Sequence, residues 1–257
     1  MTDYTNENAN NSNISARRKR KQEKKRAALL RRNARLLSRG PPTSFVGKHK
    51  WLGGAIDPAT GYIYGIPSHT HQIICIKPSK PTSKAEISTI PLPVEYAQGK
   101  FKWLRGVCYD GCLYGIPAWS TKGILQLHLE TQKVRVLPLP RDASHYETEP
   151  IPWKGTSDRV DRGRWMWHGG AIGTSSSGVS SIYCIPSNAQ HVLKVHLDGD
   201  EKDKVEEIGP PLVDGQNKFY GGIKGLDGCI YGMPYTATGV LRSKCIGHMF
   251  LLMSVVH

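Results

Sequence analysis

One short phrase occurs four times in this chain and constrains its fold more than any other feature. Each copy has an aromatic residue, one or two glycines, a turn, a Tyr-x-Ile/Met-Pro segment and then a pair of aliphatic residues. The copies begin at Trp51, Trp103, Trp167 and Phe219. The phrase therefore recurs about every 50 residues, and such a period, built from short strands, is typical of propeller blades.

The pattern within each copy predicts a four-stranded antiparallel blade. In the first copy we expect strands at 51–56, 62–66, 73–76 and 86–90, because apolar runs alternate there with turn residues. In the second copy, Asp110-Gly111 stands between two apolar segments and predicts a two-residue hairpin. We place the blades in residues 43–242, beginning near residues 47, 99, 163 and 215.

The repeat is interrupted once and then fades. The interval between the second and third copies is longer, which indicates an insertion within 141–163. After Leu241 the alternating pattern stops, so we expect no outer strand in the fourth blade and an atypical tail over 243–257. Gly40-Pro41-Pro42 resembles Gly209-Pro210-Pro211, so the residues before it could fill that position. The sequence thus predicts an all-β propeller of four visible blades, the last of them incomplete.

A leader at residues 1–40 differs from the repeats in composition. Its first part is rich in Asn and has little to bury, so we expect disorder. Residues 16–39 hold twelve of the Lys and Arg residues, a large share of the net charge of +14, among good helix formers. Their densest cluster is Arg17, Arg18, Lys19, Arg20, Lys21, Lys24, Lys25 and Arg26. Such a cluster is typical of nuclear-localisation or polyanion-binding segments, and a solvated tail that only aids solubility is the alternative.

The sequence shows no sign of membrane insertion or export. No apolar run reaches the ~20 residues of a membrane-spanning helix, and the N-terminus lacks the apolar core of a signal peptide. We therefore expect an intracellular protein, cytoplasmic or nuclear. Cys108 and Cys112 could be half of a metal site, but no second Cys/His pair accompanies them, so we interpret them as small buried strand residues.

Two sets of residues are candidates for binding. A glycine followed by one or two bases precedes each of the four aromatic residues, and a ring of Lys50, Lys102 and Lys218 could attract an acidic partner, a phosphate or a nucleic acid. The loops after the prolines offer His69, Trp119, Asn188 and Tyr235 as contact residues. We expect Trp51, Trp103, Trp167 and Phe219 to pack between blades instead.

Nothing in the sequence indicates catalysis. No nucleophile elbow, phosphate loop, kinase signature or zinc-protease motif is present. His128 and His196 occupy matching positions in third strands, where we expect them to face solvent rather than to bind a metal. We therefore predict no catalytic residues, no metal ligands and no cofactor.

The Trp51-Leu52-Gly53-Gly54 opening and the Tyr-Gly-Ile-Pro segments resemble the repeats of kelch-type and related β-propeller proteins, most of all a poorly characterised group with Tyr-Gly-Ile-Pro blades. The resemblance covers about residues 43–242. The second half of the kelch signature, a Tyr followed six residues later by Trp, is absent. Galactose oxidase has a related propeller, but its copper ligands have no counterparts here.

Three functions remain open from the sequence. The first is a non-catalytic protein-interaction scaffold whose loop face binds a protein partner. The second is a nuclear or polyanion-binding protein that acts through residues 16–39 together with the lysine ring, with nucleic acid among its possible ligands. The third is an enzyme with an unidentified site in the mouth of the propeller.

Overall fold

The structure of the chain is a computed structural model. It describes residues 20, 23–24, 47–79, 83–119, 122–142, 145–146, 163–212, 215–243 and 250–254. The chain divides into residues 1–45 and residues 46–257. In the first unit, Arg20, Glu23 and Lys24 are described and have helical backbones, and the rest of the predicted basic cluster lies outside the described residues. No helix among the described residues has the length and apolar character needed to cross a bilayer.

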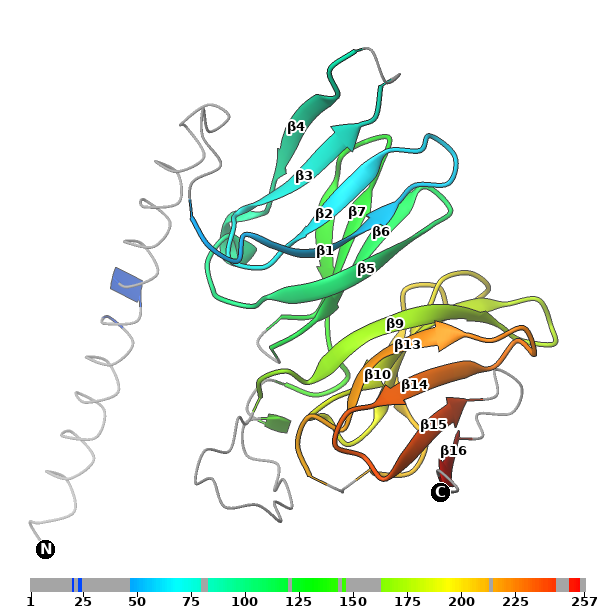
Figure 1. The fold of residues 1–257 in the computed structure, drawn as a ribbon. Helices are drawn as coiled ribbons and strands as arrows, with labels where there is room; N and C mark the ends of the chain where they lie inside the picture. Colours follow the sequence, from blue (N-terminus) through cyan, green and yellow to red (C-terminus); the bar gives the residue numbers. More distant parts are fainter. Residues whose placement is uncertain are drawn as a thin grey trace, which may run out of the picture. The chain divides into compact units, whose positions relative to one another are not determined.

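The second unit consists of four antiparallel sheets of four strands each (Figure 1). Blade 1 contains β1 (Trp51–Ile56), β2 (Ile63–Pro67), β3 (Gln72–Lys77) and β4 (Glu86–Pro91), followed by the short 3-10 helix η1 (Val94–Tyr96). Blade 2 contains β5 (Trp103–Tyr109), β6 (Cys112–Pro117), β7 (Ile124–His128) and β8 (Val134–Leu137). Blade 3 contains β9 (Trp167–Thr174), β10 (Ser180–Pro186), β11 (Val192–His196) and β12 (Val205–Ile208). Blade 4 contains β13 (Phe219–Lys224), β14 (Ile230–Pro234), β15 (Gly239–Ser243) and β16 (Phe250–Ser254).

The predicted strands are present, and their order in each sheet follows the sequence. The hairpin at Asp110-Gly111 is also confirmed, since both residues have positive φ, 43° and 66°, as a tight two-residue hairpin turn requires. One expectation was wrong. Phe250–Ser254 pairs with Gly239–Ser243 as an outer strand, so blade 4 has the four strands that we did not expect of it. An uninterrupted apolar segment completes an edge as well as an alternating one does, because pairing uses backbone groups.

The aromatic residue that opens each phrase anchors its blade. Trp103, Trp167 and Phe219 are fully buried and pack against the preceding blade, as predicted, and Trp51 is half-buried. Each tryptophan also binds its own sheet through the indole N–H. The Nε1 atom of Trp103 donates to the carbonyl oxygen of Gly123 at 2.7 Å, and that of Trp167 donates to His191 at 3.0 Å. The tryptophans of the phrase therefore serve to pack the blades rather than to bind a ligand, because their indole N–H groups already have hydrogen-bond partners within the sheet.

Neighbouring blades are joined near the start of their inner strands. The backbone N–H of Lys102 donates to Ser68 in blade 1, that of Met166 donates to Ala118 in blade 2, and that of Lys218 donates to Ser187 in blade 3. These hydrogen bonds align the inner strands β1, β5, β9 and β13 in succession. They also bring together the loops that enter each blade and the loops that follow each proline. We call the surface made by these two sets of loops the loop face.

Candidate functional site: the loop face and its central arginine

Rings from two repeated positions form a cluster on the loop face. His49, Phe101 and Trp165 enter blades 1, 2 and 3, and all three have left-handed backbones, with φ of 53°, 48° and 50°. His69 and Trp119 follow the prolines of blades 1 and 2. The ring of Phe101 lies 4.3 Å from that of His69, 5.5 Å from Trp119 and 4.7 Å from Trp165, centroid to centroid. We call these five residues the aromatic cluster.

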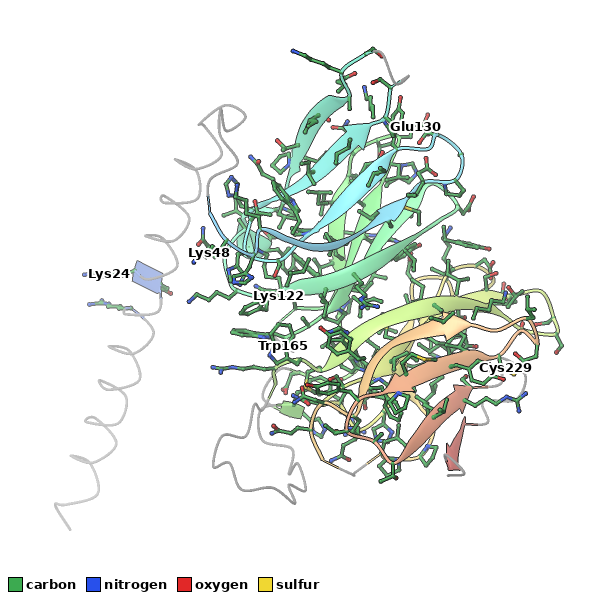
Figure 2. All side chains as sticks on the ribbon, in the orientation of Figure 1. Lys24, Lys48, Lys122, Glu130, Trp165 and Cys229 are labelled. Atoms are coloured by element: carbon green, nitrogen blue, oxygen red, sulfur yellow. The ribbon has the colours of Figure 1, made fainter. Side chains whose placement is uncertain are left out.

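The surface around the aromatic cluster is cationic. Lys48, Lys100 and Arg164 are exposed and precede the three left-handed residues. The Cζ atom of Arg164 lies 4.9 Å from the ring centroid of Trp119, a cation–π contact. Figure 2 shows Lys48 and Trp165 on the same side of the blades, and Glu130 and Cys229 away from them. A face with rings and cations together suits an anionic partner that also offers apolar or planar groups.

The predicted lysine ring is not a surface feature of this face. Lys102 is fully buried, and its Nζ donates to the carbonyl oxygen of Thr70 at 2.7 Å. Burial and the charge of Lys122 lower the pKa of Lys102 to about 7. Lys218 is buried as well, and Lys50 is half-buried with its Nζ 5.5 Å from the Trp51 ring. A left-handed residue precedes each of these lysines. In blades 1 and 2 it reverses the chain, so that Lys48 and Lys100 meet solvent while Lys50 and Lys102 lie beneath the loops.

The loop residues predicted from the sequence have different surroundings. His69 and Trp119 belong to the aromatic cluster, and burial lowers the pKa of His69, with a further contribution from the charge of His49. The side chain of Asn188 is buried and links blades 3 and 4, since it donates to the carbonyl oxygen of Arg164 and accepts from the backbone N–H of Asn217. Tyr235 is exposed, and its ring lies 5.8 Å from that of Tyr220.

Tyr220 is in contact with Arg105, a residue that was not predicted from the sequence as a candidate for binding. Arg105 lies in the inner strand of blade 2 at a position where the other three blades have glycine, namely Gly53, Gly169 and Gly221. The pairing register of β5 shifts there, as in a β-bulge, and Arg105 has φ of 61°. A left-handed backbone suits glycine and costs other residues roughly 1 kcal/mol. An arginine among three glycines was the signal that could have identified this residue from the sequence.

The side chain of Arg105 crosses the inner strands of the next two blades. Its Cδ atom would lie 2.9 Å from a Cβ atom at Gly169, and its Nη1 atom 2.7 Å from one at Gly221. The Cζ atom is 5.8 Å from the centroid of the Tyr220 ring. Within the part of the chain that the structure describes, the exposed guanidinium has no hydrogen bond and no ion pair. Its donors are therefore available to a ligand.

His168 lies beside this arginine. Its ring stacks on that of Tyr220 with centroids 3.6 Å apart, and its Nδ1 atom is buried without a hydrogen-bond partner among the described residues. Burial and the charge of Arg105 lower the pKa of His168 to about 4, so the imidazole is neutral at pH 7. A neutral imidazole can donate one hydrogen bond. We call Arg105, His168 and Tyr220 the central group.

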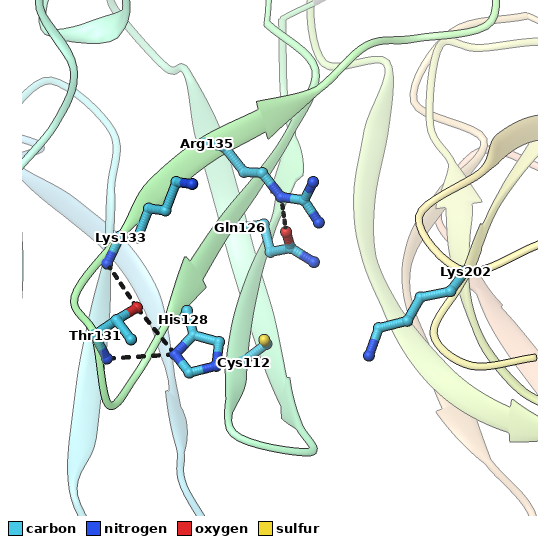
Figure 3. Close-up of a pocket in the computed structure, with 7 residues that line it drawn as sticks. All are labelled: Cys112, Gln126, His128, Thr131, Lys133, Arg135 and Lys202. Atoms are coloured by element: carbon cyan, nitrogen blue, oxygen red, sulfur yellow. Dashed lines mark hydrogen bonds between the residues drawn. The ribbon is translucent and has the colours of Figure 1, made fainter.

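A cavity lies between the outer parts of blades 2 and 3, away from the loop face (Figure 3). It has a volume of about 280 Å³ and is lined by Cys112, Gln126, His128, Thr131, Lys133, Arg135 and Lys202. Arg135 already binds Asp203 and the side-chain oxygen of Gln126. Burial raises the pKa of the Cys112 thiol, which makes it a poor nucleophile. Arg135 of this cavity thus serves to join blade 2 to Asp203 of blade 3.

Among the described residues, His196, Glu201 and Glu206 in blade 3 could hold a metal ion, since their ligand atoms lie within 4.8 Å of one another. His196 is buried, contrary to the expectation that it faces solvent. Its Nε2 atom is 2.7 Å from Glu206, and Lys204 binds both glutamates. Because a lysine ammonium already neutralises these carboxylates, the arrangement is that of an ion-pair network.

Comparisons with known proteins identify a fold but no family. No family model matches the sequence, and no curated protein matches it. A virginiamycin B lyase from Staphylococcus aureus has a TM-score of 0.52 and 14% identity, over 80% of this chain and 56% of that one. A streptogramin B lyase structure has a TM-score of 0.53 and 13% identity, over 82% and 57%. The fold is a β-propeller.

At this level of identity the likeness concerns the fold alone, and it does not single out kelch-type repeats. The chain spans little more than half the length of these two structures. A proposal about function must therefore rest on the residues of the loop face.

Proposed function

We propose that this propeller is a non-catalytic protein-binding scaffold, and that its loop face takes an acidic segment of a partner protein. The observation that carries the proposal is Arg105: its backbone is left-handed, and its exposed guanidinium lies over two glycines with no hydrogen bond or ion pair among the described residues. A carboxylate is the natural ligand of a guanidinium, because two parallel N–H groups match its two oxygens.

The rest of the loop face supports the same kind of ligand. A neutral His168 can donate a hydrogen bond to a carboxylate oxygen without proton uptake. Half-exposed rings such as Trp165 and Trp119 can cover the apolar stems of a bound segment, and aromatic residues and Arg are enriched in protein interfaces. The exposed charges of Lys48, Lys100 and Arg164 would speed the association with an acidic partner in a salt-dependent way.

The proposal is tested with a fluorescein-labelled glutamate peptide and the full-length chain, by fluorescence polarisation. The basic leader also attracts anions, so the assay is repeated in a background with the basic cluster of 17–26 changed to glutamine. We expect Arg105→Gly to weaken peptide binding about tenfold or more in both backgrounds. Lys133→Gly, which removes a cation away from the loop face, is the matched control and should leave binding unchanged.

The opposite pattern would reject the proposal. If glutamine in the basic cluster abolished binding and Arg105→Gly had no effect, the leader alone would be responsible. That outcome would favour the polyanion-binding function. Binding of a single-stranded oligonucleotide to the same set of proteins would then test that function.

The role of the basic cluster in localisation also stays a prediction. Arg20 and Lys24, the two members that are described, are exposed, as an import signal requires. Nuclear accumulation of a fluorescent fusion, and its loss when the cluster is changed to glutamine, would support it. An unchanged distribution would contradict it.

A further inference from the structure

Successive blades pack through one repeated contact. An isoleucine from the second strand of each of blades 1 to 3 fits beside a glycine in the inner strand of the next blade. If Gly106 carried a Cβ atom, it would be 2.6 Å from Ile66, and one at Gly222 would be 2.5 Å from Ile185. We call the isoleucine the knob and the glycine with its cross-strand partner the notch. The knobs are Ile66, Ile116, Ile185 and Met233, and the notches are Gly54 with Gly65, Gly106 with Gly115, Gly170 with Cys184, and Gly222 with Gly232.

Three knobs are buried in a notch of the next blade, and the fourth is exposed. Ile66, Ile116 and Ile185 are at most 1% exposed, whereas Met233 is 38% exposed. Ile223 lies beside Met233 on the same face of blade 4, and it is 63% exposed. Its equivalent in blade 3, Ala171, packs against the next blade in the cluster that contains Phe219. The outer apolar face of blade 4 therefore has the composition of an interface between blades.

The notch of blade 1 holds no knob from another blade among the described residues. The atoms nearest to Cβ positions at Gly54 and Gly65 come from blade 1 itself, whereas in blade 2 they include those of Ile66 from the preceding blade. Ile56 is on this face and is 62% exposed. Its equivalents in blades 2 and 3, Cys108 and Ile172, pack against the preceding blade. Within the described residues, one knob and one notch of the same pattern are thus left unfilled.

We propose that a second copy of this chain fills both, with the two copies joined head to tail. Met233 of each copy occupies the Gly54–Gly65 notch of the other, so that two identical contacts close a ring of two four-bladed halves. This pairing has twofold symmetry, the commonest symmetry of soluble oligomers, and propellers typically have four to eight blades. Because Met233 and Ile56 are exposed, these faces of blades 4 and 1 are not packed against each other within one copy. The inference does not depend on the function proposed above.

Sedimentation velocity of the full-length chain over a range of concentrations tests the pairing. We expect a species of twice the 28.5 kDa of one chain, in equilibrium with the monomer. Ile223→Lys and Ile56→Lys change side chains that are already exposed, so each variant should fold. Each places a charge in the contact and should raise the dissociation constant at least about tenfold, the effect of losing a central anchor. Leu226→Lys, on the exposed turn of blade 4, is the matched control and should leave the dimer unchanged.

Mixing the two interface variants separates head-to-tail pairing from other modes. A mixed dimer keeps one unaltered contact, blade 4 of the Ile56→Lys chain against blade 1 of the Ile223→Lys chain. The mixture should therefore associate more tightly than either variant alone. A dimer that resists Ile56→Lys would mean that blade 4 pairs with itself, which would overturn the proposal. A monomer at every concentration, or a series of growing oligomers, would overturn it as well.

Discussion

The side chain of Arg105 covers the backbone of Gly221, and a Cβ atom at position 221 would lie 2.7 Å from its Nη1 atom. Gly221 has φ of 98°, and Arg105 has φ of 61° at the same position of another blade. One blade thus has an arginine where the repeat favours glycine, and two other blades keep the glycines that make room for it. Residues held in sparsely populated backbone regions cluster at functional sites, which is consistent with a binding role for this arginine.

The first prediction concerns the cost of this conformation. Arg105→Gly restores the repeat and removes the left-handed strain, so the free energy of unfolding should stay the same or rise by up to about 1 kcal/mol. Urea denaturation measures this change. A fall of more than about 1 kcal/mol would mean that the arginine stabilises the propeller, and its exposed guanidinium would then not be reserved for a ligand.

The second prediction concerns the buried Lys102. Its pKa is about 7 in the folded protein, against 10.5 for an ordinary lysine. Between these values the unfolded chain binds more protons than the folded one, so the free energy of unfolding rises with pH. From pH 7 to pH 9.5 the wild-type protein should gain roughly 1–3 kcal/mol relative to Lys102→Met, which has no such group.

Urea denaturation of both proteins at several pH values measures this difference. Lys84→Met, at an exposed position, is the matched control and should follow the wild type. Parallel curves for the wild type and Lys102→Met would show that Lys102 keeps an ordinary pKa.

The third prediction concerns the ion-pair network of blade 3. Burial raises the pKa of Glu206, but hydrogen bonds from His196 and Lys204 outweigh it, and the pKa falls to about 2 from 4.5. This group therefore stabilises the fold above pH 4.5, and the contribution disappears as the pH falls toward 2. Glu206→Gln should lower the free energy of unfolding at pH 7 by about 1–3 kcal/mol, because it weakens charged hydrogen bonds.

Thermal denaturation at pH 7, 4.5 and 3 follows this difference, which should shrink with falling pH. Glu130→Gln, at an exposed position in blade 2, should have little effect at any pH. If Glu206→Gln were as stable as the wild type at pH 7, the network would contribute nothing to the fold.

The strands could be predicted because their signals are local. The phrase that begins at Trp103 contains its own turn at Asp110-Gly111, its own proline at Pro117 and an alternating pattern between them, and each acts within a few residues. The burial of Trp103 followed from its place in a repeat. The outer strand Phe250–Ser254 could not be predicted, because its residues do not alternate between apolar and polar. It forms a strand because its backbone pairs with Gly239–Ser243 at the edge of the sheet.

The sequence by itself determined the propeller fold, the four visible blades with all but one of their strands, and the aromatic residues that pack between blades, because the repeat gives the same packing pattern four times. Only the tertiary structure decided which cations are available. Lys102 and Arg105 are three positions apart in the same segment, yet one is buried against a carbonyl oxygen and the other is exposed over glycines. The physical reason is that a side chain's direction depends on left-handed turns and bulges, and on the neighbouring blades that leave or fill the space around it.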